Sequence, residues 1–212
     1  GVNAAVIFIC VWLANVPDVT TSETARQDTP RNVLDVVVFY PDRLRDADRY
    51  SVQVRQEVQR FLARARGYRP RSRPPRLGSE MRMVYAAREG YEGKLVASAA
   101  VAGTARLAQQ YVDALRPCYE WEGFHDCPER EAVFAEQHLR DRPDTPFRDF
   151  LRVLAAHRWL CTAEGYEYEQ KPADALRARR AYEAALKMAM EQSRSVLMAT
   201  AANELKASGR CH

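Results

Sequence analysis

The sequence has none of the short motifs that identify common enzyme classes. It contains no HExxH zinc-protease motif, no glycine-rich phosphate-binding loop, no GxSxG nucleophile motif and no calcium-loop spacing. Glycine is scarce, and nine glycines without a period exclude a collagen-like protein. A net charge of +4 does not by itself indicate nucleic-acid binding. The 212 residues suffice for one domain with a sizeable core.

Residues 4–14 (AAVIFICVWLA) form an apolar run without a charge. The run is too short to span a bilayer, but it is typical of the hydrophobic part of a secretory signal peptide. We therefore expect 1–16 to be a truncated signal peptide or apolar anchor, followed by a polar linker over 17–32. A buried first strand or helix is the alternative. The signal interpretation predicts a periplasmic or secreted protein that meets a membrane only through this segment.

The chain has five cysteines, and removal of the signal segment with Cys10 would leave an even four. We expect two disulfides, Cys118–Cys127 closing a short loop and Cys161–Cys211 tying a helix to the C-terminus. Four buried thiols in a cytosolic protein are the alternative. A zinc site made of Cys118, His125 and Cys127 has poor spacing for a standard module. We therefore expect neither a metal nor a cofactor.

Apolar spacing after residue 45 is helical almost throughout. The interruption is a basic, proline-rich loop at 67–78, because proline removes donors and fixes φ. Residues 33–40 (VLDVVVFY) are β-branched and form either a strand or the start of a helix. The expected helices cover 47–66, 79–116, 129–140, 146–166, 172–191 and 193–207. The predicted fold is mainly α, a single domain over 33–212 built as antiparallel helical hairpins or a bundle, with a repeat-like arrangement as one form of it and an irregular N-terminal segment.

Residues 128–191 carry a proline-containing corner and two helical segments with regular small and aromatic positions. Residues 142–146 (RPDTP) match the corner between repeats, and a large–small–Tyr pattern follows in one helix and a small–aromatic–small pattern in the next. These positions are Trp159, Ala163 and Tyr166, then Ala178, Tyr182 and Ala185. The connector between the two helices is about three residues too long for a strict repeat. With these residues, 128–191 resemble tetratricopeptide-like helical repeats. The resemblance implies a repeat-like helical hairpin of the kind found in exported bacterial assembly proteins.

Residues 118–131 (CYEWEGFHDCPERE) gather acids and aromatic side chains in one short segment. Such a loop could hold a cation, supply a carboxylate pair for catalysis, or present a binding face. It could equally be a disulfide-closed loop with its aromatics folded inward and its acids in water. The side chains concerned are Glu120, Trp121, Glu122, Phe124, His125 and Asp126.

The helix over 146–166 is apolar around much of its circumference, and Arg158 falls on its core face. An unpaired buried charge costs several kcal/mol, so we expect a carboxylate partner. The acids of the 118–127 loop are the expected partners, with Glu164 as a local alternative and His157 in the same network. Arg152 is expected on the more polar side of this helix.

Seven arginines and no acid occur over 60–76. This density suits nucleic acid or an anionic surface. A solvated arm, or one packed on acidic helices, is the preferred interpretation. Nucleic-acid binding would require a cytosolic protein with reduced cysteines, which conflicts with the signal segment, so we do not expect a nucleic-acid partner.

These observations predict an exported, non-enzymatic interaction or assembly module with a protein partner. Its binding face would comprise the helix pair 146–191 and the 118–127 loop. The alternative is a hydrolase of cell-envelope or extracellular material, which would combine Glu120, Glu122 or Asp126 with His125 or His157. The expected binding residues are Trp121, Phe124, His125, Arg158, Trp159 and Tyr166.

Overall fold

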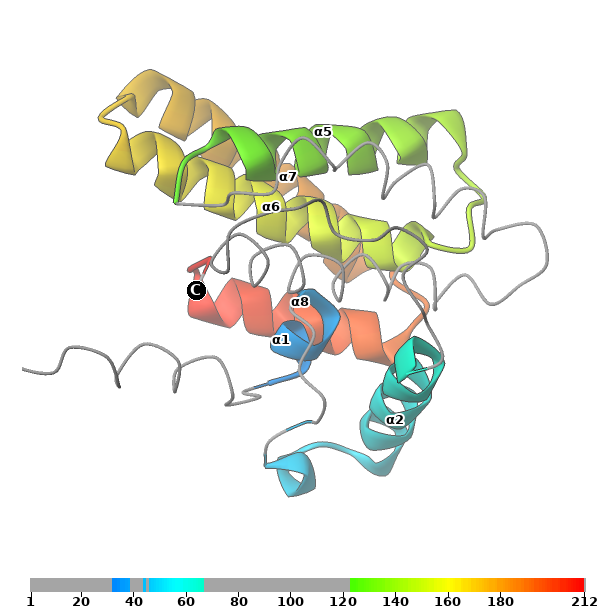
Figure 1. The fold of residues 1–212 in the computed structure, drawn as a ribbon. Coiled ribbons are helices and arrows are strands. Elements are labelled where there is room, and N and C mark those ends of the chain that lie inside the picture. The colour runs from blue at the N-terminus through cyan, green and yellow to red at the C-terminus, as the bar shows by residue number, and fades with distance from the viewer. Residues whose placement is uncertain (1–31, 39–43, 45, 67–122, 212) are drawn as a thin grey trace, which may run out of the picture.

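The computed structural model describes residues 32–38, 44, 46–66 and 123–211, and these form a helical bundle (Figure 1). About 80% of the described residues are helical, and none of them forms a strand. The predicted mainly-α fold is therefore confirmed. The helices are α1 (Val33–Val38), the 3-10 helix η2 (Ala47–Arg49), α2 (Val52–Arg66), α5 (Asp126–Asp141), α6 (Arg148–Tyr168), α7 (Pro172–Gln192) and α8 (Val196–Ser208).

Several predictions lie outside these residues. They are the signal segment, the linker, the proline-rich loop, the helix over 79–116, most of the 60–76 arginine run, and the side chains of Cys10, Cys118, Glu120, Trp121 and Glu122. Among the helices that the structure describes, none is long and apolar enough to cross a membrane.

The helix ends follow ordinary capping chemistry. Pro172 occupies the first turn of α7, where its missing N–H has no helical partner to lose. Ser195 caps α8, because its side chain accepts a hydrogen bond from the Met198 N–H. Gly209 ends α8 in the left-handed conformation, at φ 59°. The α5 helix begins three residues earlier than predicted and places Pro128 in its first turn, where the N–H is again unneeded.

The run 33–38 is a helix, which decides between the two interpretations left open by its sequence. Its valines and Leu34 are buried, and the helix packs on α8. Two side chains satisfy its first N–H groups: Asn32 Oδ1 accepts from the Asp35 N–H at 2.8 Å, and Glu204 Oε2 accepts from the Leu34 N–H at 2.8 Å. Burial against α8 and these two caps outweigh the β preference of valine.

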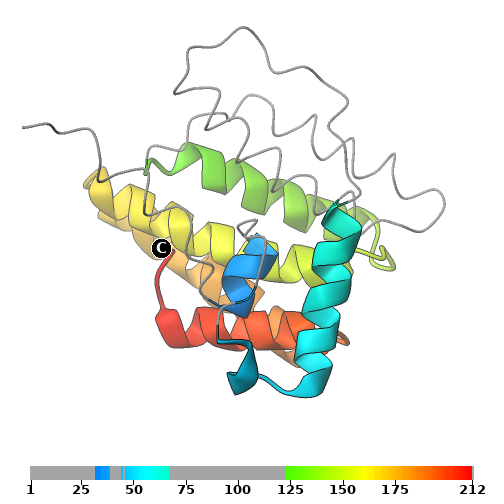
Figure 2. The same cartoon turned by 60° about the horizontal axis from the view of Figure 1, so that its bottom comes forward.

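The α6 helix is the centre of the bundle (Figures 1 and 2). It lies antiparallel to α5 and to α7, which precede and follow it in the chain, and α8 runs along its other side. The α2 helix crosses α8, as Figure 2 shows. Most residues of α6 are buried, as expected for a helix that is apolar around much of its circumference.

Candidate functional site

Arg158 is buried in the bundle, with 1% of its surface exposed. The prediction of a core arginine is confirmed. Neither of the predicted partners that the structure describes pairs with it in the contacts observed: Asp126 is exposed, and Glu164 accepts a hydrogen bond from the Cys211 N–H at 3.0 Å. Instead, Arg158 Nε donates to Glu131 of α5, whose side chain is fully buried. Glu120 and Glu122 lie outside the described residues, so their pairing with Arg158 stays a prediction.

His157 joins the same network, as predicted. Its Nδ1 lies 2.6 Å from Nη1 of Arg158, and its Nε2 lies 3.1 Å from the carbonyl oxygen of Cys211. A guanidinium only donates, so Nδ1 accepts and the proton of the ring is on Nε2. With both ring nitrogens engaged and no exposed surface, His157 cannot meet a substrate from solution. This removes His157 from the hydrolase alternative.

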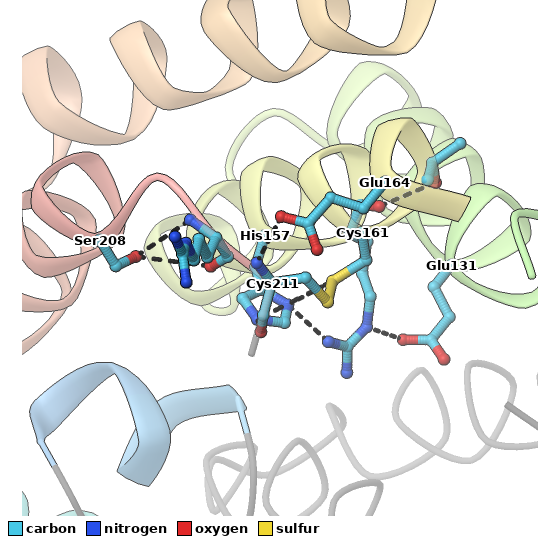
Figure 3. Close-up of a disulfide and its surroundings, with 9 residues drawn as sticks. Glu131, His157, Cys161, Glu164, Ser208 and Cys211 are labelled. Atoms are coloured by element: carbon cyan, nitrogen blue, oxygen red, sulfur yellow. Dashed lines mark hydrogen bonds and ion pairs between the residues drawn. A yellow bond between two sulfur atoms is a disulfide. The ribbon is translucent and has the colours of Figure 1, made fainter. Parts of the chain in front are cut away.

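The disulfide Cys161–Cys211 is present and confirms one of the two predicted bridges. It joins α6 to the C-terminal tail directly beside His157, and Figure 3 shows Glu131 on the neighbouring helix. Glu131, His157, Arg158, Cys161 and Cys211 are called the buried cluster below. Cys127 is buried on α5. Its predicted partner Cys118 lies outside the described residues, so that bridge stays a prediction.

Arg152 lies on the more polar side of α6 beside Asp149, as predicted, although its side chain is only 14% exposed and lies against the end of α7. Its Nη1 donates to the carbonyl oxygen of Gln192 at 3.0 Å, and its Nη2 donates to Gln192 Oε1 at 2.6 Å. Desolvation of the guanidinium lowers the pKa of Arg152 from its usual value. The end of α7 therefore partly covers Arg152 on the more polar side of α6.

A second group of side chains lies where α5 begins and α6 ends. His125 precedes α5, and both its backbone N–H and its Nδ1 contact Glu169 Oε1, the former at 3.1 Å. Its ring stacks on Tyr166 with the centroids 4.0 Å apart. Lys171 Nζ donates to the other carboxylate oxygen of Glu169 at 2.6 Å. Lys171 and then His125 lower the pKa of Glu169 to about 2.

Gly165 permits this approach of α5 to α6. A Cβ at position 165 would lie 2.6 Å from the backbone nitrogen of His125 and 2.8 Å from the carbonyl carbon of Phe124. Both atoms belong to the backbone, so no side-chain rotation could relieve the clash. Glycine is therefore required for His125 to reach Glu169.

Tyr166 ties this group to α5 and α7. Its hydroxyl donates to Glu129 Oε2 at 2.7 Å and accepts from Nη2 of Arg177 at 3.2 Å. Burial, followed by the hydrogen bond to Glu129, raises the pKa of Tyr166 to about 12. The tyrosine therefore stays neutral throughout the physiological range.

Two aromatic side chains next to this group are exposed to solvent. Phe124 is 43% exposed and Tyr168 is 71% exposed, and their rings meet edge to face with centroids 5.9 Å apart. The set is called the aromatic end and consists of Phe124, His125, Tyr166, Tyr168, Glu169 and Lys171. It includes three of the predicted binding residues. Tyr168, Glu169 and Lys171 were not predicted, and the signal that could have found them is Gly165, which marks a close backbone approach.

Trp159 and Arg158, the other predicted binding residues that the structure describes, lie elsewhere, and Trp121 is outside the described residues. Trp159 is almost buried, and its Nε1 donates to Glu136 Oε1 at 2.8 Å. It shares a small apolar cluster with the positions that carry the repeat resemblance: Ala163, Tyr166, Ala178, Tyr182 and Ala185. Arg158 belongs to the buried cluster rather than to a surface.

A cavity of about 320 Å³ lies between α2, α6 and α8, and none of the predicted catalytic residues that the structure describes lines it. The two carboxylates among its described lining residues, Glu57 and Asp149, accept hydrogen bonds at the start of α8. Glu57 Oε2 accepts from Ser195 Oγ and from the Leu197 N–H, both at 3.0 Å, and Asp149 Oδ2 accepts from the Arg194 N–H at 2.8 Å. These acids therefore have a structural role.

Comparisons with protein-family models, with curated proteins and with solved structures find no match to this chain.

Proposed function

We propose that this protein is an exported, non-enzymatic interaction or assembly module that binds a protein partner through the aromatic end. The observation that carries the proposal is that Phe124 and Tyr168 are exposed and their rings are in contact, next to the polar contacts of Glu169. Tyrosine and phenylalanine are enriched in protein interfaces, where they supply large contact areas.

The contacts of His125, Tyr166 and Glu169 limit the conformational entropy that the chain would lose on binding. Phe124 precedes His125, whose backbone N–H is held by Glu169, and Tyr168 ends the helix that carries Tyr166. Both exposed rings are therefore attached to backbone that is already ordered. Preorganised aromatic anchors bind with little further loss of side-chain freedom.

Export is supported by the disulfide Cys161–Cys211 together with the apolar run at 4–14. Disulfides persist in oxidising compartments and are rare in the cytosol. The antiparallel pair α6–α7, packed through the positions that carry the repeat resemblance, is the kind of scaffold on which repeat-like proteins present binding faces.

Site-specific photocrosslinking tests the proposal. A photoreactive amino acid at position 168 of the full chain, expressed in its native host, is expected to give one discrete cross-linked protein. The matched control is position 188. Met188 is 42% exposed, close to the value for Phe124, but it lies on α7 and is not part of the aromatic end. The absence of an adduct from 168, or the same adduct from both positions, would contradict the proposal.

A hydrolase remains the second candidate because of one contact. A carboxylate bonded to Nδ1 of a histidine fixes the tautomer that leaves Nε2 free to accept a proton, and Glu169 makes this contact with His125. Hydrolysis of purified cell-wall material by the wild type and its loss in His125→Gln would favour the enzyme. Unchanged hydrolysis in that variant, or none in either protein, would remove it.

A further inference from the structure

We propose that His157, Cys161 and Cys211 form a buried zinc site when the disulfide is reduced. Their donor atoms all lie within 4.8 Å of one another, and all three residues are buried. The site differs from the zinc arrangement of Cys118, His125 and Cys127 considered from the sequence, and it departs from the expectation that the chain holds no metal.

The arrangement of the donors suits a tetrahedral ion. His157 and Cys161 are four residues apart on α6, so they share one face of the helix, and Cys211 comes from the tail. The sulfur of Cys161 lies 3.5 Å from Nδ1 of His157 and 4.0 Å from its Nε2. Zinc takes Cys sulfur at about 2.3 Å and His nitrogen at about 2.0–2.1 Å, so an ion can lie between such a pair. The three ligands found among the described residues leave a fourth position for water or another donor.

The tautomer of His157 is already the one that ligation through Nδ1 requires. Its Nε2–H donates to the carbonyl oxygen of Cys211 at 3.1 Å, and a zinc-bound histidine commonly donates its other N–H to a carbonyl or carboxylate. In the disulfide form, a cationic group stands against Nδ1, namely the Arg158 guanidinium. Zinc would replace Nη1 of Arg158 beside Nδ1 of His157, while Nε of Arg158 keeps its ion pair with Glu131.

The reaction balances with a dithiol as the reductant. The dithiol transfers two electrons and two protons to the Cys161–Cys211 disulfide, which becomes two thiols, and the dithiol itself becomes a cyclic disulfide. Binding of Zn²⁺ then displaces the two thiol protons to solvent and leaves a neutral zinc dithiolate. The tail can adjust because residues 209 and 210 are exposed beyond the end of α8. The disulfide and the zinc site therefore exclude each other.

Cobalt titration of the reduced full chain tests the site directly. One equivalent of Co²⁺ is expected to bind with sulfur-to-cobalt charge-transfer absorption, and the oxidised chain is expected to lack this signal. Cys161→Ser, Cys211→Ser and His157→Gln should lose this equivalent. Cys118→Ser/Cys127→Ser should keep it, and circular dichroism checks that each variant is folded. No sulfur-bound cobalt in the reduced wild type, or an unchanged signal in Cys161→Ser, would overturn the proposal.

A second measurement needs no variant. Oxidised glutathione is added to the reduced wild type with and without one equivalent of Zn²⁺, and formation of the Cys161–Cys211 bridge is followed by mass spectrometry. Zinc is expected to slow the bridge at least tenfold, because its thiolates are occupied. Equal rates would overturn the proposal.

Discussion

Arg158 of α6 and Glu131 of α5 form an ion pair in the interior of the bundle, with both side chains almost completely removed from solvent. The pair joins two neighbouring helices. Through His157, the same network reaches the carbonyl oxygen of Cys211 in the C-terminal tail. Three separate segments of the chain therefore depend on the placement of one guanidinium.

Breaking this pair is expected to destabilise the fold strongly. Arg158→Ala should lower the free energy of unfolding by about 3–5 kcal/mol, because it leaves the Glu131 carboxylate buried without its counter-charge. The matched control is Arg179→Ala, whose ion pair with Glu167 is 40% and 46% exposed and should contribute less than about 1 kcal/mol. Denaturant midpoints measure both. Equal midpoints would contradict the expectation that the buried pair contributes more to stability than the exposed pair.

The position of Arg158 could be predicted from the sequence, but its partner Glu131 was not. The helical spacing of Phe147, Leu151, Leu154 and Cys161 places Arg158 on the core face whatever surrounds it. Its partner depends on which helix packs there. Glu131 is one turn from Cys127 and one turn from Ala135, and all three are buried, so an apolar face of α5 carries this acid. That spacing was the available signal for Glu131.

Loss of the disulfide is expected to destabilise the chain by up to about 4 kcal/mol, the chain-entropy value for a cross-link over 50 residues. Cys211→Ser, measured with a chelator present so that no metal compensates, tests this by thermal unfolding. Non-reducing peptide mapping of the wild type provides the control. Recovery of Cys161 and Cys211 as free thiols from oxidising conditions would contradict the assignment.

Gly165→Ala should separate α5 from α6 at the aromatic end, since its methyl group would meet the backbone of Phe124 and His125. We expect a loss of about 1–3 kcal/mol, as for other overpacked sites. We also expect loss of the His125–Glu169 contact, visible as a changed chemical shift of the His125 ring. Gly209→Ala is the control, because open space surrounds it and only its φ of 59° is unfavourable. A native His125 signal in Gly165→Ala would contradict the close approach.

The contact of Glu169 with Lys171 and His125 should make stability sensitive to acid. The pKa of Glu169 is lowered from 4.5 to about 2, so folding favours the ionised form. The contribution is complete above about pH 4.5 and is lost as the pH falls from there through 2. Unfolding of the wild type and Glu169→Gln, compared between pH 6 and pH 2, isolates it. The difference between the two proteins should shrink as the pH falls, and a constant difference would refute the assignment.

The aromatic end was only partly predictable, for a similar physical reason. Phe124 and His125 stood out because the segment around them is rich in acids and aromatics. Glu169 and Lys171 follow the end of α6 and look like ordinary solvent-exposed charges in sequence. They become part of the site only because α5 approaches α6 at Gly165. Arg152 lies on the more polar side of α6, as its spacing predicts, but its partner Gln192 depends on how the end of α7 packs there.

The most direct test of the proposed function is the affinity of the protein that cross-links to position 168. Its dissociation constant is measured by calorimetry for the wild type, Tyr168→Ala and Met188→Ala. Tyr168→Ala should weaken binding at least tenfold, as loss of an aromatic anchor does, and Met188→Ala should leave it unchanged. Equal affinities for all three proteins would contradict a binding surface at the aromatic end.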